Sequence, residues 1–167
     1  ITNDGSINAS NDGIEVSSTN QVTNTSTGEI TTTNGNGILA VNSNTITNDG
    51  SINAGDNGIG IEVGASNTVT NSTTGIIDAE SNGILATSAA NTISNAGTIG
   101  SNISVGDDGI NALTSNNTVT NSGTINASND GIQVGSTNTV SNESTGSITS
   151  GVGDGILAVD GNTITND

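Results

Sequence analysis

NTVTNSGTINASNDGIQV, residues 117–134, contains three short segments in which aliphatic and polar side chains alternate. In the last of them Ile132 and Val134 share one face, whereas Gln133 points the other way. A period of two predicts β-strands rather than helices. Residues typical of turns, such as Gly131, separate the segments. This stretch therefore predicts three short strands joined by tight corners.

The same pattern recurs along the whole chain. A Gly-Ile pair opens each copy, and the copies begin at Gly13, Gly37, Gly60, Gly83, Gly109, Gly131 and Gly155, 22 to 26 residues apart. We expect a period of 23–24 residues, with small insertions near Gly58 and near Ile103–Val105. Three short strands per period, repeated about seven times, predict an all-β parallel β-solenoid. We interpret residues 1–167 as one solenoid segment.

A longer period lies above the short one. The sequence around Gly13 returns around Gly131, 118 residues and five coils later, and the tetrapeptide ITND stands at residues 1–4 and 164–167. This super-repeat favours a segment of a longer array of coils.

The repeat predicts which side chains stack inside the solenoid. The three apolar stacks are Ile14, Ile38, Ile61, Ile84, Ile110, Ile132 and Ile156; Val22, Ile46, Val69, Ile93, Val119, Val140 and Ile164; and Ile7, Ile30, Ile52, Ile77, Ile99, Ile125 and Ile148. Their β-branched side chains suit a pleated wall. We expect the glycines at the corners to need either a positive φ or a close backbone approach.

Two asparagines flank the middle strand of nearly every coil. They are Asn20, Asn44, Asn67, Asn91, Asn117, Asn138 and Asn162 before it, and Asn24, Asn48, Asn71, Asn95, Asn121, Asn142 and Asn166 at its end. Stacked amides about 4.8 Å apart can bond up the coils and form asparagine ladders. The alternative is that asparagine only favours turns.

The composition excludes several classes of function. The chain has no Lys, Arg, His, Cys or aromatic residue and a formal net charge of −16. A nucleic-acid partner would need cations, and no apolar run is long enough for a membrane span. Without a base for a nucleophile or an aromatic sugar platform, we expect no enzyme activity and no required cofactor. A disordered polar linker is the alternative to a folded chain.

The phrases TVTNSGTI, TISNAGTI and GDGILAV resemble the passenger repeats of bacterial autotransporter adhesins and haemagglutinin-like surface proteins. The resemblance covers essentially the whole chain. It implies an exported, right-handed parallel β-helix that acts as a stalk or adhesin at the cell surface. Copies of itself and cell-surface or matrix glycans would be its partners.

Carboxylates gather at the corner that precedes the Gly-Ile pair. Asp12, Asp107, Asp108, Asp130 and Asp154 lie there, and the segment VGDDG at 105–109 is the densest part. Stacked carboxylates with no protein cation suit Ca²⁺, which prefers oxygen ligands. The alternative is that these are solvated aspartates chosen for turn geometry.

Two outward-facing sets suggest interaction surfaces. The first is a threonine grid similar to the faces of ice-binding β-solenoids: Thr45, Thr47, Thr68, Thr70, Thr118, Thr120, Thr163 and Thr165. Thr is also an ordinary exposed strand residue. The second set, Leu39, Leu85 and Leu157, would contact another chain laterally or a covering segment, although single exposed leucines are ordinary. The leading hypothesis is an extracellular structural fibre or adhesin stalk, with ice binding as the alternative.

Overall fold

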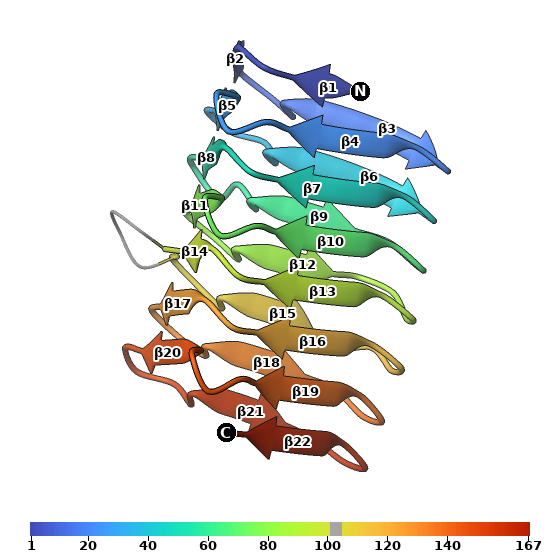
Figure 1. Cartoon of the computed structure of the whole chain (residues 1–167), viewed down its shortest axis with the longest axis vertical. Coiled ribbons are helices and arrows are strands. Elements are labelled where there is room, and N and C mark those ends of the chain that lie inside the picture. The colour runs from blue at the N-terminus through green and yellow to red at the C-terminus, as the bar shows by residue number, and fades with distance from the viewer. Residues whose placement is uncertain (101–104) are drawn as a thin grey trace.

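A computed structural model describes residues 1–100 and 105–167 of the chain. The described strands form three parallel sheets, and each turn of the chain adds one strand to each sheet. Figure 1 shows the strands stacked in columns, with the N-terminus at one end of the stack and the C-terminus at the other. The prediction of a parallel β-solenoid of about seven coils is confirmed. The expected insertion near Ile103 lies outside the described residues.

The middle strand of each repeat belongs to sheet A, whose eight strands follow one another in chain order. They are β1 (Thr2–Asn3), β4 (Gln21–Asn24), β7 (Thr45–Asn48), β10 (Thr68–Asn71), β13 (Thr92–Asn95), β16 (Thr118–Asn121), β19 (Thr139–Asn142) and β22 (Thr163–Asn166).

Sheets B and C have seven described strands each. Sheet B contains β2 (Ser6–Ala9), β5 (Glu29–Thr32), β8 (Ser51–Ala54), β11 (Ile76–Ala79), β14 (Thr98–Ile99), β17 (Thr124–Ala127) and β20 (Ser147–Ser150). Sheet C, which carries the Gly-Ile segments, contains β3 (Ile14–Ser18), β6 (Ile38–Asn42), β9 (Ile61–Val63), β12 (Ile84–Ala86), β15 (Ile110–Ala112), β18 (Ile132–Val134) and β21 (Ile156–Ala158).

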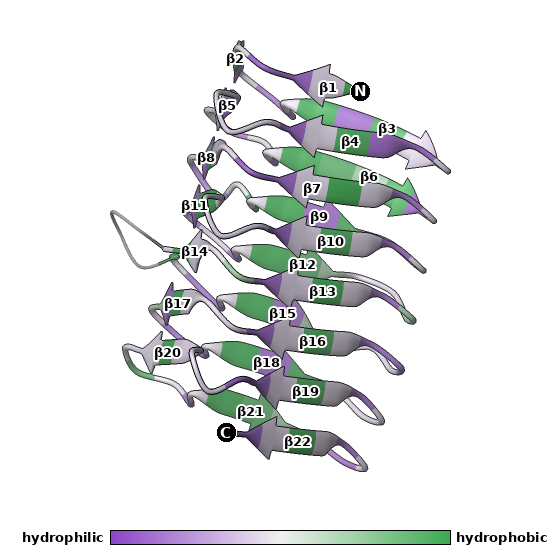
Figure 2. Cartoon of the chain, viewed as in Figure 1, coloured by the Kyte–Doolittle hydropathy of each residue, from purple (hydrophilic) through white to green (hydrophobic). Residues whose placement is uncertain are grey.

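The register places identical positions of successive coils side by side. In sheet A, for example, Val69 pairs with Ile46 on one side and Ile93 on the other. All three predicted apolar stacks are confirmed in this way, and their internal members are fully buried. Figure 2 shows the resulting hydrophobic band along the middle of the sheet A strands. A thin, continuous aliphatic core therefore runs the length of the solenoid.

Left-handed backbone is found at one corner of every coil, directly before the first asparagine of sheet A. The residues there are Thr19, Ser43, Ser66, Ala90, Asn116, Thr137 and Gly161, with φ between 56° and 67°. Only the last of them is a glycine, although a left-handed conformation costs other residues about 1 kcal/mol. The sequence signals this corner only at Asn116 and Gly161, because Thr, Ser and Ala do not favour a left-handed conformation.

Most corner glycines serve the second expected purpose, a close approach between coils. A Cβ built on Gly83 would lie 2.6 Å from the carbonyl oxygen of Gly109 and would overlap the Cγ2 methyl group of Ile99. The glycines that open the other internal coils show the same crowding. The absence of a side chain at this corner lets adjacent coils approach closely enough to pair.

Candidate functional site

The asparagines that end the sheet A strands form a continuous ladder, which we call the trailing ladder. In each bond Nδ2 of one asparagine donates to Oδ1 of the next, at 2.8–2.9 Å, from Asn3 through Asn24, Asn48, Asn71, Asn95, Asn121 and Asn142 to Asn166. Every donor points toward the C-terminal end of the solenoid. The ladder prediction is confirmed, and the bonds satisfy amides that are buried away from water.

The asparagines before the strands form a second row, the leading ladder. From Asn44 to Asn162, each Oδ1 accepts the backbone N–H of the equivalent asparagine one coil earlier, at 2.7–2.9 Å. Several Nδ2 groups add a side-chain bond, as from Asn44 to Asn67 at 3.1 Å. Since the left-handed residue directly precedes each of these asparagines, the ladder holds the strained corner in place.

The acidic corner contains a third row, in which each side-chain oxygen accepts a backbone N–H from the following coil instead of the preceding one. Oδ1 of Asp12 accepts the backbone N–H of Asn36 at 2.7 Å, and Oδ1 of Asp108 accepts that of Asp130 at 3.1 Å. Asp130 in turn accepts from the N–H of Asp154 at 2.6 Å. Only an acceptor is required here, so Asp and Asn can replace one another between coils. Sequence reasoning did not identify this role for the corner aspartates.

The predicted metal ligands do not all lie together. Asp108, Asp130 and Asp154 follow one another up the coils, whereas Asp12 lies in the first coil beside Asn36. Within the described residues, no group of three or more acidic side chains is placed to hold a metal ion. The calcium site stays a prediction.

The negative charge of this corner affects the pKa of Asp107. Partial burial raises the pKa of its carboxyl above the ordinary 3.8, and the charges of Asp108 and Asp130 raise it further. A raised pKa in the folded protein means that the ionised carboxylate is destabilising. Protonated Asp107 therefore adds to the free energy of unfolding. This contribution is fully present below pH 3.8 and is lost as the pH rises through the folded-state pKa.

Asp107→Asn should therefore raise the melting temperature at neutral pH, because it removes the repulsion. The gain should disappear below pH 3.8, where the native side chain is also neutral. Thermal melts between pH 3 and pH 8 would measure it, with Asp160→Asn at an exposed turn as the charge-matched control. An equal gain in both variants would show that only net charge matters.

Sheet A presents two outward ranks of hydroxyl side chains. Thr45, Thr68, Thr92, Thr118, Thr139 and Thr163 form an exposed rank, and Thr23, Thr47, Thr70 and Thr120 belong to a second rank that is half-buried. Strand spacing places neighbours about 4.8 Å apart, and the two ranks lie about 6.7 Å apart. Gln21, Ser94 and Ser141 interrupt the pattern. The predicted grid is thus in register, and its ice-binding role stays a prediction.

The three leucines are less exposed to solvent than their outward positions in the sequence pattern suggest. Leu39, Leu85 and Leu157 are half-buried on the outer side of sheet C, and Glu62 separates the first two. More exposed apolar side chains lie near the C-terminal ends of single strands of this sheet, namely Val41 in β6, Leu113 after β15 and Val159 after β21, between 44% and 61% exposed. Lateral contact through the leucines stays a prediction.

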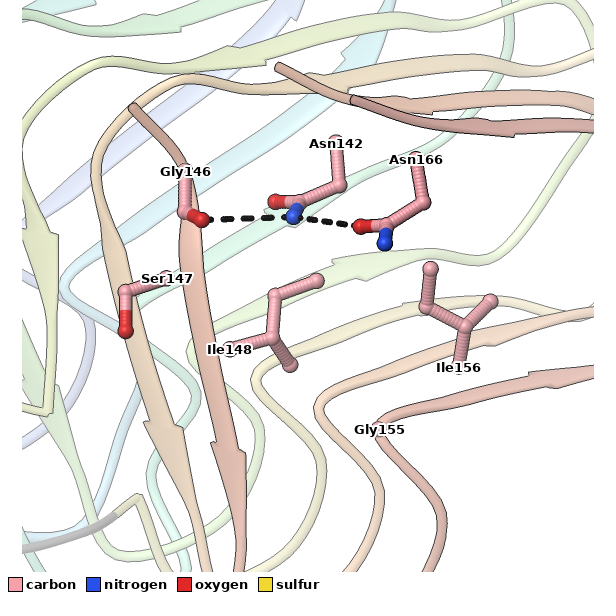
Figure 3. Close-up of a pocket in the computed structure, with 7 residues that line it drawn as sticks. All are labelled: Asn142, Gly146, Ser147, Ile148, Gly155, Ile156 and Asn166. Atoms are coloured by element: carbon pink, nitrogen blue, oxygen red, sulfur yellow. Dashed lines mark hydrogen bonds between the residues drawn. The ribbon is translucent and has the colours of Figure 1, made fainter. Parts of the chain in front are cut away.

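The last coil leaves its interior open. A hollow of about 590 Å³ is lined by Asn142, Gly146, Ser147, Ile148, Gly155, Ile156 and Asn166. Figure 3 shows the last ladder bond crossing it, from Nδ2 of Asn142 to Oδ1 of Asn166. Ile164 in this coil is 45% exposed, whereas Val140 at the same position one coil earlier is fully buried. A Cβ on Gly155 would have no neighbour within 4 Å.

No family model matches the chain, and neither the curated proteins nor the solved structures contain a significant match to it. The structure describes no helix long and apolar enough to cross a membrane. Three in-register sheets with an asparagine ladder define a class, the parallel β-solenoid repeat proteins.

Proposed function

We propose that this chain is a structural segment of an extracellular surface fibre or adhesin stalk, in which coils stack on further coils. The observation that carries the proposal is the register of the coils, in which each internal coil extends the sheets, the apolar stacks and the trailing ladder of the coil before it. In the coil that contains Asn166, Ile164 is 45% exposed. A further coil would bury the exposed part of Ile164 and extend the ladder.

A second copy of the chain can supply that coil. Each turn adds a strand to sheet A, then to sheet B and then to sheet C, so β22 would be followed by one strand in sheet B and one in sheet C. The strands β2 and β3 of the second copy would take these two places. Its short β1 then competes with β22 for one place in sheet A. Residues 1–4 and 164–167 are the same tetrapeptide, so β22 can replace β1 without changing a side chain. Nδ2 of Asn166 would then donate to Asn24 of the second copy.

The rest of the surface suits a stalk. A net charge of −16 keeps parallel rods apart through repulsion until cations screen it. The absence of Lys and Arg removes every cleavage site for a trypsin-type protease. Cell-surface or matrix glycans would be partners of the assembled fibre, as the resemblance to autotransporter adhesins implies.

Gly155→Ala should abolish end-on association while leaving the melting temperature unchanged. In the equivalent internal coil, a Cβ on Gly131 would overlap Ile148 and lie 2.6 Å from the Gly155 carbonyl oxygen. The second copy would bring Ile7 and Gly13 to the same place over Gly155. Sedimentation velocity and electron microscopy would measure the association.

Two further variants make this test decisive. A chain that lacks residues 1–3 has no strand to compete with β22, and it should associate more readily than the wild type. Thr73→Ala, in an exposed turn, should associate normally. The stacking proposal would be wrong if Gly155→Ala associates like the wild type, or if even the shortened chain stays monomeric at millimolar concentration.

The hydroxyl grid supports a second candidate function, ice binding. Hydroxyl groups both donate and accept hydrogen bonds, so two regular ranks can order water above sheet A. The specific observation is that the Thr118 strand stays in register with its neighbours on both sides. Thermal hysteresis that is present in the wild type and reduced in Thr118→Glu would support ice binding. A wild-type protein without thermal hysteresis would exclude ice binding.

A further inference from the structure

One buried amide on the outer side of sheet C is incompletely bonded. The side chain of Asn111 is only 8% exposed, and its Nδ2 donates to Oδ2 of Asp108 at 2.7 Å and to Oε1 of Gln133 at 2.9 Å. Among the described residues its Oδ1 is the one buried side-chain oxygen without a hydrogen-bond partner. Buried polar atoms without a partner are rare in folded proteins and require an explanation.

Rotation of the amide does not remove the problem. A half-turn exchanges the nitrogen and oxygen of Asn111. Oδ1 would then face Oδ2 of Asp108 and Oε1 of Gln133, which are also acceptors. The cluster continues to Asp130, whose Oδ2 already accepts from Nε2 of Gln133 at 3.3 Å. This group therefore has more acceptor oxygens than donors in either orientation.

The charge of the cluster is also uncompensated by other side chains. Asp108 is 2% exposed and Asp130 is 4% exposed. The protein has no Lys, Arg or His that could pair with them. Asp108 relies on neutral donors, among them Nδ2 of Asn129 at 2.8 Å. Buried charges in proteins are usually paired with an opposite charge or bound to a metal ion.

We infer that this cluster binds one Ca²⁺ ion through Asp108, the side-chain oxygen of Asn111 and the side-chain oxygen of Gln133. Asp107 and Asp130 add negative charge beside the ion, and water completes the six to eight oxygen ligands that Ca²⁺ takes. Binding would turn the Asn111 amide by a half-turn, so that its oxygen replaces Nδ2 opposite Oδ2 of Asp108 and Oε1 of Gln133, and the ion would provide the positive charge that these three oxygens need. Two of the three ligands are amides, which agrees with the absence of a triad of acidic side chains in the described part of the chain.

The sequence pattern confines the site to two adjacent coils. An aspartate with an amide three residues later occurs at Asp108 and Asn111, and again at Asp130 and Gln133. Three residues after the other corner aspartates stand Glu15 for Asp12, Ile110 for Asp107 and Leu157 for Asp154. The inferred site is therefore narrower than the full set of corner aspartates, and it is independent of end-on stacking.

Asn111→Leu is the decisive variant. Leucine occupies the equivalent position at Leu39, Leu85 and Leu157, so the fold accepts it, and the net charge stays at −16. Isothermal titration of the full chain with CaCl₂ should show one site in the wild type and at least a tenfold weaker affinity in Asn111→Leu. The melting temperature of the wild type should rise with Ca²⁺ more than with NaCl of equal ionic strength.

Two aspartate variants separate a specific site from general screening. Asp108→Asn should lose the calcium response, and Asn82 shows that asparagine fits the equivalent corner of another coil. Asp12→Asn removes the same charge from a corner without the amides and should keep the response. Absence of a calcium response in the wild type, or an equal response in Asn111→Leu and the wild type, would overturn the inference.

Discussion

Asn71→Asp should destabilise the protein by about 4 kcal/mol, which is a large part of the stability of an ordinary domain. The two side chains have the same shape, so packing is unchanged. Nδ2 of Asn71 donates to Oδ1 of Asn95 at 2.8 Å and to the carbonyl oxygens of Gly75 and Thr98 at 3.2 and 3.3 Å. In the variant a carboxylate oxygen faces those three acceptors at a fully buried position.

Thermal or urea unfolding would measure this effect, and a loss of roughly 10 °C in melting temperature is expected. Asn71→Ala should cost about 2–3 kcal/mol, since it leaves the neighbours of the amide unpaired without adding a charge. The control is Asn53→Ala, because Asn53 lies on the exposed side of β8, where the expected change is within about 0.5 kcal/mol. Acidification should restore part of the loss in Asn71→Asp, because a protonated carboxyl can donate one hydrogen bond. If both Asn71 variants melt like the control, the ladder does not hold the coils together.

Gly83→Ala should destabilise the protein by about 2–3 kcal/mol through steric overlap between coils. The added methyl group would overlap the side chain of Ile99 and lie 2.6 Å from the carbonyl oxygen of Gly109. Ile99 pairs with Ile77 and Ile125 in sheet B, and the carbonyl oxygen of Gly109 accepts the backbone N–H of Ile84 at 3.0 Å, so neither can move without disturbing a backbone hydrogen bond.

The same substitution at the open end provides a matched control. Gly155 holds the equivalent corner of the last coil, and a Cβ there meets nothing within 4 Å. Gly155→Ala should therefore change the unfolding free energy by less than about 0.5 kcal/mol in the monomer. An equal loss in both variants would mean that backbone flexibility, and not contact between coils, explains the glycine at this corner.

Repetition makes much of this fold predictable from the sequence. Because the same residue returns every coil, the alternation in residues 117–134 fixes which side chains face inward, and the period aligns Val119 with Ile93 and Val140. The ladders follow by the same logic, since Asn71 and Asn95 must lie one strand spacing apart if Val69 and Ile93 do. No knowledge of distant parts of the chain is needed for these conclusions.

The acidic corner shows what the repeat does not encode. The sequence places Asp12, Asp108 and Asp154 in equivalent positions, yet Asp108 is buried and Asp154 is exposed. Position in the described solenoid accounts for that difference, because Asp154 lies in the last described coil, whereas the coil of Asp130 lies against Asp108. The backbone N–H of Asp130, in the next coil, donates to Oδ1 of Asp108 at 3.1 Å. A residue's type does not reveal which backbone group will face it across the coil boundary.

The sequence by itself determined the solenoid, its three apolar stacks and its two asparagine ladders, because each depends only on residue type and on a period of 23–24. Only the tertiary structure decided the left-handed corner at Ala90, the crowding at Gly83 and the unpaired oxygen of Asn111. Each of these residues contacts an adjacent coil about 5 Å away, and the contacting residues stand some two dozen positions apart in the chain, as Ala90 and Ser115 or Asn111 and Gln133 do.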